Sequence, residues 1–228
     1  KLSKEYNLYI IEDCAEALGS KWNNQNVGTF GNASTFSFFG NKTITTGEGG
    51  MVLFKSKEIS IRAKALRDHG MNPKKRYWHD VIGYNFRLTN IQAAIGVAQL
   101  EKFETIVQKK IHIGKSYNKL LRDHELVAQV PEVYDTIVNS YWIFSLLLKK
   151  KISRNEIIRR LLELGVETRP VFYPLHEMPP YQHLKRSQSL KNSINISKYG
   201  LSLPSATSLT DVNIKYIIYC LDKISSES

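Results

Sequence analysis

Cysteines and long hydrophobic runs are both scarce in this sequence. Only Cys14 and Cys220 occur among the 228 residues. They are too few for a disulfide framework and lack metal-ligand spacing, so we expect two buried, unreactive thiols and no bound metal. No run reaches the ~20 apolar residues that span a bilayer, and residues 1–7 lack the apolar core of a signal peptide. We therefore expect no membrane partner and a cytoplasmic location.

Negative charge is also in deficit, because 21 acidic residues face 32 basic residues and the net charge is +11. Such a charge attracts polyanions, and nucleic acid is the obvious candidate. The basic residues, however, lie in short scattered groups such as residues 74–76 and 149–151, with no zinc-finger spacing and no aromatic RNA-binding motif. We expect no nucleic-acid partner. A small phosphorylated ligand and a merely solvated basic surface both remain compatible with the charge.

The first part of the chain alternates between strand-like and helical patterns. Apolar and β-branched runs predict strands at residues 7–11, 35–39 and 51–54. Ser56 can cap the helix that follows, and a long helix can begin at Thr89 or Asn90 and end near residue 121. This alternation predicts an α/β domain over residues 1–122, with the long helix connecting it to a second lobe.

The second part, residues 123–228, has the pattern of a smaller α+β lobe. A strand, a capped amphipathic helix and a final helix are predicted at residues 141–148, 153–164 and 211–224. His112 and His124 fall on the polar side of the long helical segment, so we expect both on the surface. With 42% hydrophobic residues, the chain can bury a sizeable core.

One lysine stands out for its surroundings. Lys42 follows the apolar run at residues 35–39 and begins a glycine-rich turn within FSFFGNKTITTGEGG, residues 36–50. Partial desolvation behind aromatic residues disfavours the ammonium form, which frees the amine to attack a carbonyl or form a Schiff base. The alternative is an ordinary surface lysine in a loop.

One acid has a matching position. Asp13 follows the first predicted strand, and ligands of open α/β sheets bind at the carboxyl ends of the strands. A carboxylate there can hold a pyridine nitrogen protonated, although an Asp at a strand end can also simply cap the next turn. An acid after one strand and a lysine after another match the pair that pyridoxal phosphate needs.

Three segments, in this order, resemble the nucleotide-sugar aminotransferases of the DegT type, which are fold type I pyridoxal phosphate enzymes. They are EDCAEALG at residues 12–19, FSFFGNKTITTGEGG at 36–50 and GYNFRLTNIQAAIG at 83–96. The resemblance covers nearly the whole chain. It implies the C-terminal part of such an enzyme: a partial three-layer α/β/α large domain that binds the cofactor, and a smaller α+β domain. The family's N-terminal portion has no counterpart here.

The resemblance also implies roles around the cofactor. Lys42 would bond to pyridoxal 5′-phosphate and move a proton between two carbons, while Asp13 would pair with the pyridine nitrogen. Glu16 occupies the position near the phenolic oxygen, where glutamine or histidine is familiar. Ser37 would donate to the phosphate, unless its hydroxyl is satisfied by its own backbone. Asn85 matches a residue that reaches the cofactor phosphate of a neighbouring subunit, which implies a homodimer with shared active sites.

Further residues are candidates for the substrate. Arg87 could bind an anionic group of the substrate or anchor its own loop through an internal ion pair. Residues 169–176 contain two prolines that fix the backbone. By resemblance this loop faces the nucleotide sugar through Arg169, Tyr173 and His176, and the alternative is a packed proline loop.

The implied activity is transfer of an amino group, with glutamate as the expected donor, to a nucleotide-linked 4-keto-6-deoxy sugar. Related sugar dehydratases that use the same cofactor have histidine in place of the lysine, so Lys42 favours amine transfer. The alternative is a truncated, non-catalytic remnant of such an enzyme. Missing strands would leave apolar sheet edges exposed in a remnant.

Overall fold

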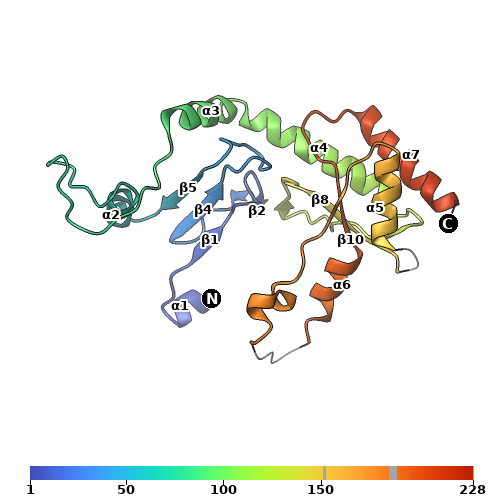
Figure 1. Cartoon of the computed structure of the whole chain (residues 1–228), viewed down its shortest axis with the longest axis horizontal. Helices are drawn as coiled ribbons and strands as arrows, with labels where there is room; N and C mark the ends of the chain where they lie inside the picture. The colour runs from blue at the N-terminus through green and yellow to red at the C-terminus, as the bar shows by residue number, and fades with distance from the viewer. Residues whose placement is uncertain (151–152, 185–188, 228) are drawn as a thin grey trace. The chain divides into compact units, whose positions relative to one another are not determined.

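The computed structural model describes residues 1–150, 153–184 and 189–227 (Figure 1). The chain forms two compact units. Unit 1 comprises Lys1–Val107 and Tyr134–Trp142, and unit 2 comprises Gln108–Val133 and Ile143–Ser228. The assignment of residues 1–122 to a cofactor-binding domain and of residues 123–228 to a small domain stays a prediction.

The main sheet of unit 1 has the strand order β1-β4-β5. Its strands are β1 (Ile11–Asp13), β4 (Ala33–Ser37) and β5 (Gly50–Phe54). β1 and β4 are parallel, with Asp13 opposite Thr35, whereas β4 and β5 are antiparallel. Figure 1 shows β1 and β4 side by side. Because these strands are parallel, Asp13 and the segment after Ser37 lie at the same edge of the sheet.

The first strand begins later than residues 7–11 predict. The backbone N–H of Ile10 donates to the side chain of Asn32 (2.8 Å) instead of continuing a ladder, and regular pairing starts at Ile11. The aliphatic and aromatic composition of the run is typical of a strand, but Tyr9 is 82% exposed and Ile11 71% exposed. Composition therefore indicated that a strand exists but not where its pairing begins.

A second, smaller sheet completes unit 1. Its strands are β2 (Lys21–Trp22), β3 (Gln25–Asn26) and β7 (Ile137–Val138), in the order β3-β2-β7. β7 comes from far along the sequence, and residues 134–142 belong to unit 1 although the chain on both sides belongs to unit 2. The sequence pattern predicted a strand at residues 141–148. The strand β8 (Phe144–Leu148) is shorter, because Tyr141 has φ 48 and interrupts extended backbone.

The predicted helix caps in unit 1 are confirmed, but the long helix is divided. Unit 1 contains α1 (Leu2–Glu5), α2 (Lys57–Arg67) and α3 (Asn90–Leu100), and α4 (Phe103–Leu121) has residues in both units. Ser56 Oγ accepts the N–H of Ile59, and Thr89 forms a capping box with Gln92. The segment predicted as one helix breaks where the N–H of Lys102 bonds to the carbonyl of Gln99, which is a tighter turn than the α-helical one.

Unit 2 contains an antiparallel sheet in the order β6-β8-β10-β9. The other strands are β6 (Val127–Gln129), β9 (Arg169–Pro170) and β10 (Gly200–Leu203). The helices are α5 (Arg154–Glu163), α6 (Lys191–Tyr199) and α7 (Asp211–Ser226), with short 3-10 helices η1 (Leu175–Glu177) and η2 (Pro179–Tyr181). The fully buried side chains of this unit include Tyr117, Leu121, Phe144, Ile157, Leu161, Leu201 and Leu221.

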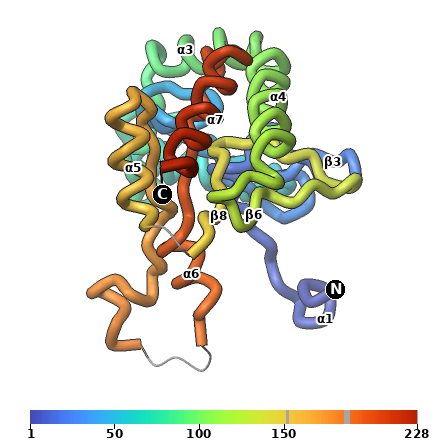
Figure 2. Tube along the Cα trace, turned by 90° about the vertical axis from the view of Figure 1, so that its right-hand side faces the viewer, coloured from blue at the N-terminus to red at the C-terminus, as the bar shows by residue number. Residues whose placement is uncertain are grey.

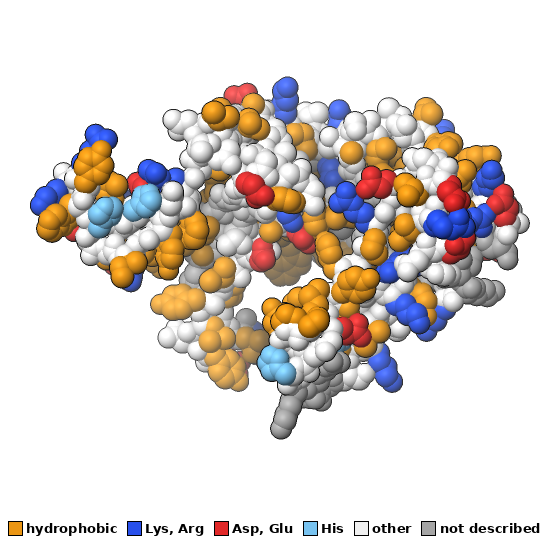
Figure 3. All heavy atoms as spheres, in the orientation of Figure 1, with side chains coloured by type: hydrophobic (Ala, Val, Ile, Leu, Met, Phe, Trp, Pro, Cys, Tyr) orange, Lys and Arg blue, Asp and Glu red, His pale blue; other side chains and the backbone are white. Residues whose placement is uncertain are grey.

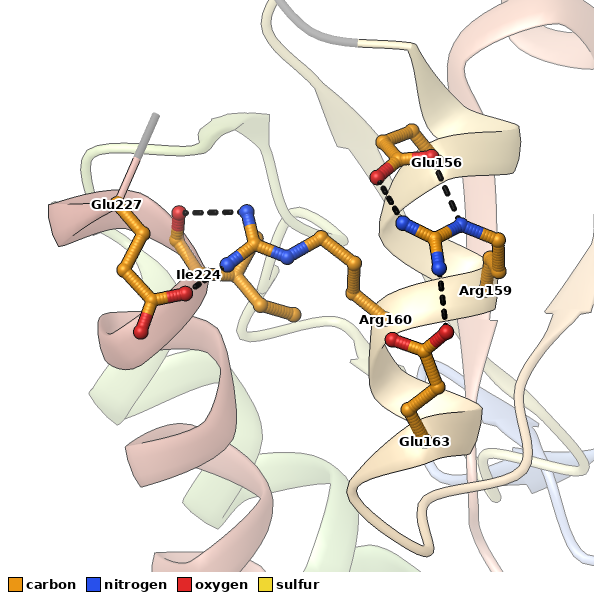
Figure 4. Close-up of polar contacts among 6 residues, drawn as sticks. All are labelled: Glu156, Arg159, Arg160, Glu163, Ile224 and Glu227. Carbon is orange, nitrogen blue, oxygen red and sulfur yellow. Dashed lines mark hydrogen bonds and ion pairs between the residues drawn. The ribbon is translucent and has the colours of Figure 1, made fainter.

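Helices α5 and α7 lie side by side in unit 2 (Figure 2). Arg160 of α5 donates to the carbonyl of Ile224 (3.4 Å) and to the carboxylate of Glu227 (Figure 4). Arg159 pairs with Glu156 and Glu163 of its own helix. The Arg159 pairs are exposed and lie within α5, so the contact between α5 and α7 rests mainly on their buried leucine and isoleucine side chains.

Both cysteines are free and buried, as expected from the sequence. Burial raises the pKa of the Cys14 thiol, and the charges of Glu12 and Asp13 raise it further. A thiol with a raised pKa is poorly nucleophilic. In the described part of the chain, no helix is both long and apolar enough to cross a membrane.

His124 lies in the interior, which corrects the expectation of a surface histidine. Its side chain is 5% exposed. Nδ1 accepts the N–H of Leu126 (3.1 Å), and Nε2 lies 3.2 Å from Asp222 Oδ1 of α7. Burial lowers the pKa of His124; the charge of Lys149 also lowers it, and Asp222 and Glu125 oppose the shift without cancelling it.

We expect unit 2 to lose stability in mild acid because of His124. With a folded-state pKa below the ordinary 6.5, the unfolded chain binds the proton more readily. The stability that neutral His124 contributes to unit 2 is therefore complete above pH 6.5 and decreases as the pH falls through the folded-state pKa. Urea unfolding between pH 7.5 and 5 tests this. The His124→Gln variant should show a smaller loss of stability over this range, and an equal loss in both proteins would contradict the prediction.

Candidate active site

Lys42 lies in the turn that follows β4, and its amine has two partners. Nζ donates to Glu16 Oε1 at 3.2 Å and lies 3.8 Å from the centroid of the Trp142 ring. The Lys42 side chain is 12% exposed, whereas that of Glu16 is 54% exposed. The sequence predicted a partly desolvated lysine here, and its low exposure agrees with that description. Glu16 provides the counter-charge.

The turn after Lys42 is fixed by its own backbone. Phe38 donates to the carbonyl of Gly49 and accepts from the N–H of Thr46, both at 2.9 Å. Gly47 has φ 79 and Gly49 has φ 141, values that side chains other than glycine rarely permit. The glycine-rich stretch is therefore a tight, internally bonded turn that holds the lysine close to the sheet edge.

Asp13 lies at the end of β1, at the same edge. Its Oδ1 accepts the N–H of Ala15 (3.1 Å) and the hydroxyl of Thr35 (3.2 Å). The Ala15 bond is the turn-capping role that the sequence left open. The residue is nonetheless exposed, and within the described residues Oδ2 accepts no hydrogen bond. Asp13 is thus an oriented carboxylate with one oxygen available to a ligand.

Glu12, one residue earlier, is a structural carboxylate that the sequence analysis did not identify. Its two oxygens accept the backbone N–H groups of Gly28 (2.7 Å), Phe30 (2.7 Å) and Gly31 (2.6 Å). Burial by itself would raise the pKa of Glu12, but these bonds and the charge of Lys55 outweigh it and lower the pKa. Glu12 and Asp13 are adjacent in a strand, so their side chains point to opposite faces of the sheet. This alternation was the available sign in the sequence that the two carboxylates have different roles.

We expect Glu12→Gln to destabilise unit 1 by about 1–3 kcal/mol, because a glutamine amide cannot accept all three bonds and leaves backbone donors unsatisfied. Because the pKa of Glu12 is lowered in the folded state, its stabilising effect is present above the ordinary carboxyl pKa of 4.5. The stabilisation is lost as the pH falls through the folded-state pKa. Urea unfolding at pH 7 and in acid should show a difference between variant and wild type that shrinks in acid. Glu48→Gln, at an exposed position of the same unit, is the control and should change little.

Ser37 ends β4, where its hydroxyl accepts the N–H of Phe39 at 3.3 Å. This is the backbone-satisfied state that the sequence offered as the alternative to phosphate binding. The hydroxyl hydrogen is not used in that bond, so Ser37 can still donate to a ligand. Its role toward a phosphate stays a prediction.

Asn85 and Arg87 lie in the loop between α2 and α3. Asn85 forms a bridge with Asp68, Arg87 Nη1 lies 3.3 Å from Asp68 Oδ1, and Arg87 Nε donates to Asn85 Oδ1 at 3.4 Å. The internal ion pair, one of the two roles left open for Arg87, is therefore present. Hydrophobic, basic and histidine side chains gather on the surface of this loop (Figure 3), as its aromatic and polar sequence indicates.

The remaining predicted substrate residues lie in unit 2. Arg169, in β9, has its guanidinium 3.5 Å from Glu167 and is 69% exposed. Tyr173 is 66% exposed, and His176 lies in η1. The structure therefore places these three residues in one segment of unit 2, and Lys42, Glu16, Asp13 and Ser37 together at one sheet edge of unit 1.

Comparison with known proteins identifies relatives over the full chain. The model of the DegT/DnrJ/EryC1/StrS aminotransferase family matches residues 1–222. GDP-perosamine synthase from Escherichia coli O157:H7 is 42% identical over 227 residues, covering 100% of this chain and 61% of the relative. GDP-perosamine synthase from Vibrio cholerae is 44% identical over 222 residues, covering 96% and 60%.

Solved structures agree with the sequence comparison. The chain superposes on Helicobacter pylori PseC, an aminotransferase involved in the biosynthesis of pseudoaminic acid, with a TM-score of 0.91 and 30% identity, over 100% of this chain and 62% of that one. The α/β fold class predicted from the sequence is confirmed. The chain spans about three fifths of the length of the curated relatives it matches. The chain belongs to the DegT/DnrJ/EryC1/StrS aminotransferase family.

Proposed function

We propose that this protein is a pyridoxal-phosphate-dependent aminotransferase acting on a nucleotide-linked 4-keto-6-deoxy sugar of the perosamine type. One observation carries the proposal: in a chain of an aminotransferase family, Lys42 is paired with Glu16, and Asp13 lies at the same sheet edge. Relatives that are 40–44% identical are GDP-perosamine synthases, which favours the perosamine type of sugar.

The residues at this edge fit pyridoxal 5′-phosphate. A sheltered amine can bond to its aldehyde, and the oxygen that Asp13 leaves available can face a pyridinium. The Ser37 hydroxyl can donate to the phosphate, and we propose that Asn85 donates to the phosphate in a neighbouring subunit of a homodimer. When bound, pyridoxal phosphate supplies a protonated ring that withdraws electrons from the reacting carbon.

The chain's own groups then have defined tasks. Lys42 Nζ would take a proton from the amine-bearing carbon of the donor and deliver it to the carbon that carried the cofactor's aldehyde, so it would act as both base and acid. Glu16, 3.2 Å away, holds the ammonium form while the lysine carries the proton. The negative charge of Asp13 favours the protonated pyridine nitrogen. Thr35 and Ala15 fix the direction of that carboxylate.

For the substrates we propose glutamate as the amino donor and a nucleotide-linked keto sugar as the acceptor. Arg169, Tyr173 and His176 supply a cation, a phenol and an imidazole of the kinds that bind phosphates and sugar hydroxyls. Arg87 Nη1 and Nε already contact Asp68 and Asn85, so Arg87 would contribute through the remaining donors of its guanidinium. The net charge of +11 attracts a sugar diphosphate. We place the product in surface polysaccharide biosynthesis, such as that of O-antigen, and the enzyme in the cytoplasm.

The test is a titration of the purified protein with pyridoxal phosphate, followed by glutamate and then by a GDP-linked 4-keto-6-deoxy sugar. We expect a visible absorbance band that glutamate removes and the keto sugar restores, with an aminated nucleotide sugar detected by mass. A UDP-linked keto sugar is the matched comparison. Absence of the visible band would overturn the proposal for this chain.

The exposed sheet of unit 1 favours a second candidate, in which this chain by itself keeps the fold but holds no cofactor. Met51, Val52 and Leu53 of β5 are each 45–50% exposed, and β5 is an edge strand. Exposed apolar edges of this kind normally have a covering partner. Under this candidate, the purified chain would aggregate or give no absorbance band, even with wild-type Lys42.

A further inference from the structure

Trp142 lies directly against the reactive lysine. Lys42 Nζ is 3.8 Å from the centroid of the indole ring, a distance at which the ring attracts a cation. We propose that Trp142 is a positioning residue that holds the Lys42 ammonium beside Glu16. The proposal deepens the proposed function and rests on it for its role in catalysis, although the contact itself can be tested without any cofactor.

The backbone that carries Trp142 is fixed to unit 1 from several points. Val138 of β7 pairs with Lys21, and the N–H of Asn23 donates to the carbonyl of Thr136 at 2.7 Å. Ser140 is fully buried, and its backbone N–H donates to Ser20 Oγ at 3.1 Å. The segment that returns from the second part of the chain is therefore held firmly up to the residues just before the indole.

The indole is also fixed by its own nitrogen. Trp142 Nε1 donates to the backbone carbonyl of Asn41 at 2.8 Å, and Asn41 immediately precedes Lys42. This bond sets the ring plane relative to the lysine backbone. The lysine side chain then has a ring and a carboxylate as partners for its charge, which restricts where its flexible stem can place Nζ. A base held in position loses less entropy when it meets the reacting carbon.

Another lysine provides a matched comparison. Lys75 Nζ lies 3.7 Å from the centroid of the Trp78 ring. Lys75 and Trp78 are both exposed, whereas the Lys42 side chain is 12% exposed and Trp142 is half-buried. A cation–ring contact is stronger where water is excluded. The Lys42 contact should therefore have the larger effect on the chemistry of its amine, although the two distances are almost equal.

The experiment measures acetylation of individual lysines by an activated acetate ester, quantified by peptide mass spectrometry, with no cofactor added. Loss of the ring in Trp142→Leu should increase the acetylation rate of Lys42 by about threefold to tenfold, because less ammonium form is stabilised. Trp142→Phe keeps a ring but loses the bond to Asn41, so its Lys42 acetylation rate should lie between those of the wild type and Trp142→Leu. Trp78→Leu should change the acetylation rate of Lys75 by less than Trp142→Leu changes that of Lys42. It should leave the acetylation rate of Lys42 unchanged.

A second measurement covers failure of the leucine variant to fold. In a Trp22→Phe, Trp78→Phe background, a fluorinated tryptophan at position 142 keeps the shape and the N–H of the indole but weakens the negative face of the ring. Acetylation of Lys42 should rise as fluorine is added. An unchanged rate in either experiment would overturn the proposal. The cofactor titration is separate, so a protein that binds no pyridoxal phosphate can still confirm or refute the contact between Trp142 and Lys42.

Discussion

Replacing Lys42 with alanine should remove the visible absorbance of lysine-bound pyridoxal phosphate and lower amino transfer by at least about 10²–10⁴-fold, the contribution of a positioned acid–base group. The amine is the only group at this sheet edge, among the described residues, that can both bond to an aldehyde and move a proton. Glu16 and Asp13 can hold charge but cannot replace an amine. The loss should therefore appear in cofactor attachment and in turnover together.

Two further variants separate the chemistry of Lys42 from its charge. Lys42→Arg keeps a cation for Glu16 and Trp142 but cannot bond to the aldehyde, so it should be as inactive as the alanine variant. Lys21→Ala, an exposed lysine of β2, should behave like the wild type. Because the Glu16 side chain is exposed to solvent, loss of the Lys42–Glu16 ion pair should cost at most about 1 kcal/mol of stability. Wild-type turnover by Lys42→Ala in a folded protein would refute the assignment.

Local signals explain which parts of the fold could be predicted from the sequence. Ser56 and Thr89 cap helices where expected because a cap depends on residues within one turn. The glycine-rich turn after Lys42 has the positive φ values that its glycines indicate. The division near Lys102 was not predicted because no proline or glycine lies there.

Long-range contacts explain what the sequence could not provide. Trp142 meets Lys42 only because residues 134–142 return to unit 1, and no local pattern in a run of apolar residues encodes that return. The same holds for His124, whose Nε2 lies 3.2 Å from Asp222, a residue almost 100 positions further along the chain. At the candidate site, the sequence could therefore identify Lys42 and Asp13 by residue type and position, but not the side chains that hold them.

Asp13→Asn should retain the fold and lysine-bound pyridoxal phosphate but lower amino transfer by on the order of 10²–10³-fold, the size of effect seen when one preorganised electrostatic group is removed. An asparagine oxygen can still accept from Ala15 and Thr35, as Asp13 Oδ1 does at 3.1 and 3.2 Å. The position now facing the ligand becomes an amide N–H, which carries no negative charge and disfavours a protonated pyridine nitrogen.

This pattern distinguishes the proposed role of Asp13 from the turn cap that the same residue forms. If the Ala15 bond were its whole contribution, asparagine would replace it with no loss of transfer, because asparagine caps such turns equally well. Stopped-flow absorbance after mixing with glutamate, alongside thermal unfolding, measures the two contributions separately. Asp135→Asn, at an exposed position of unit 1, is the control. A slow but stably folded Asp13→Asn assigns the carboxylate to the ligand, whereas a fast one assigns it to the turn.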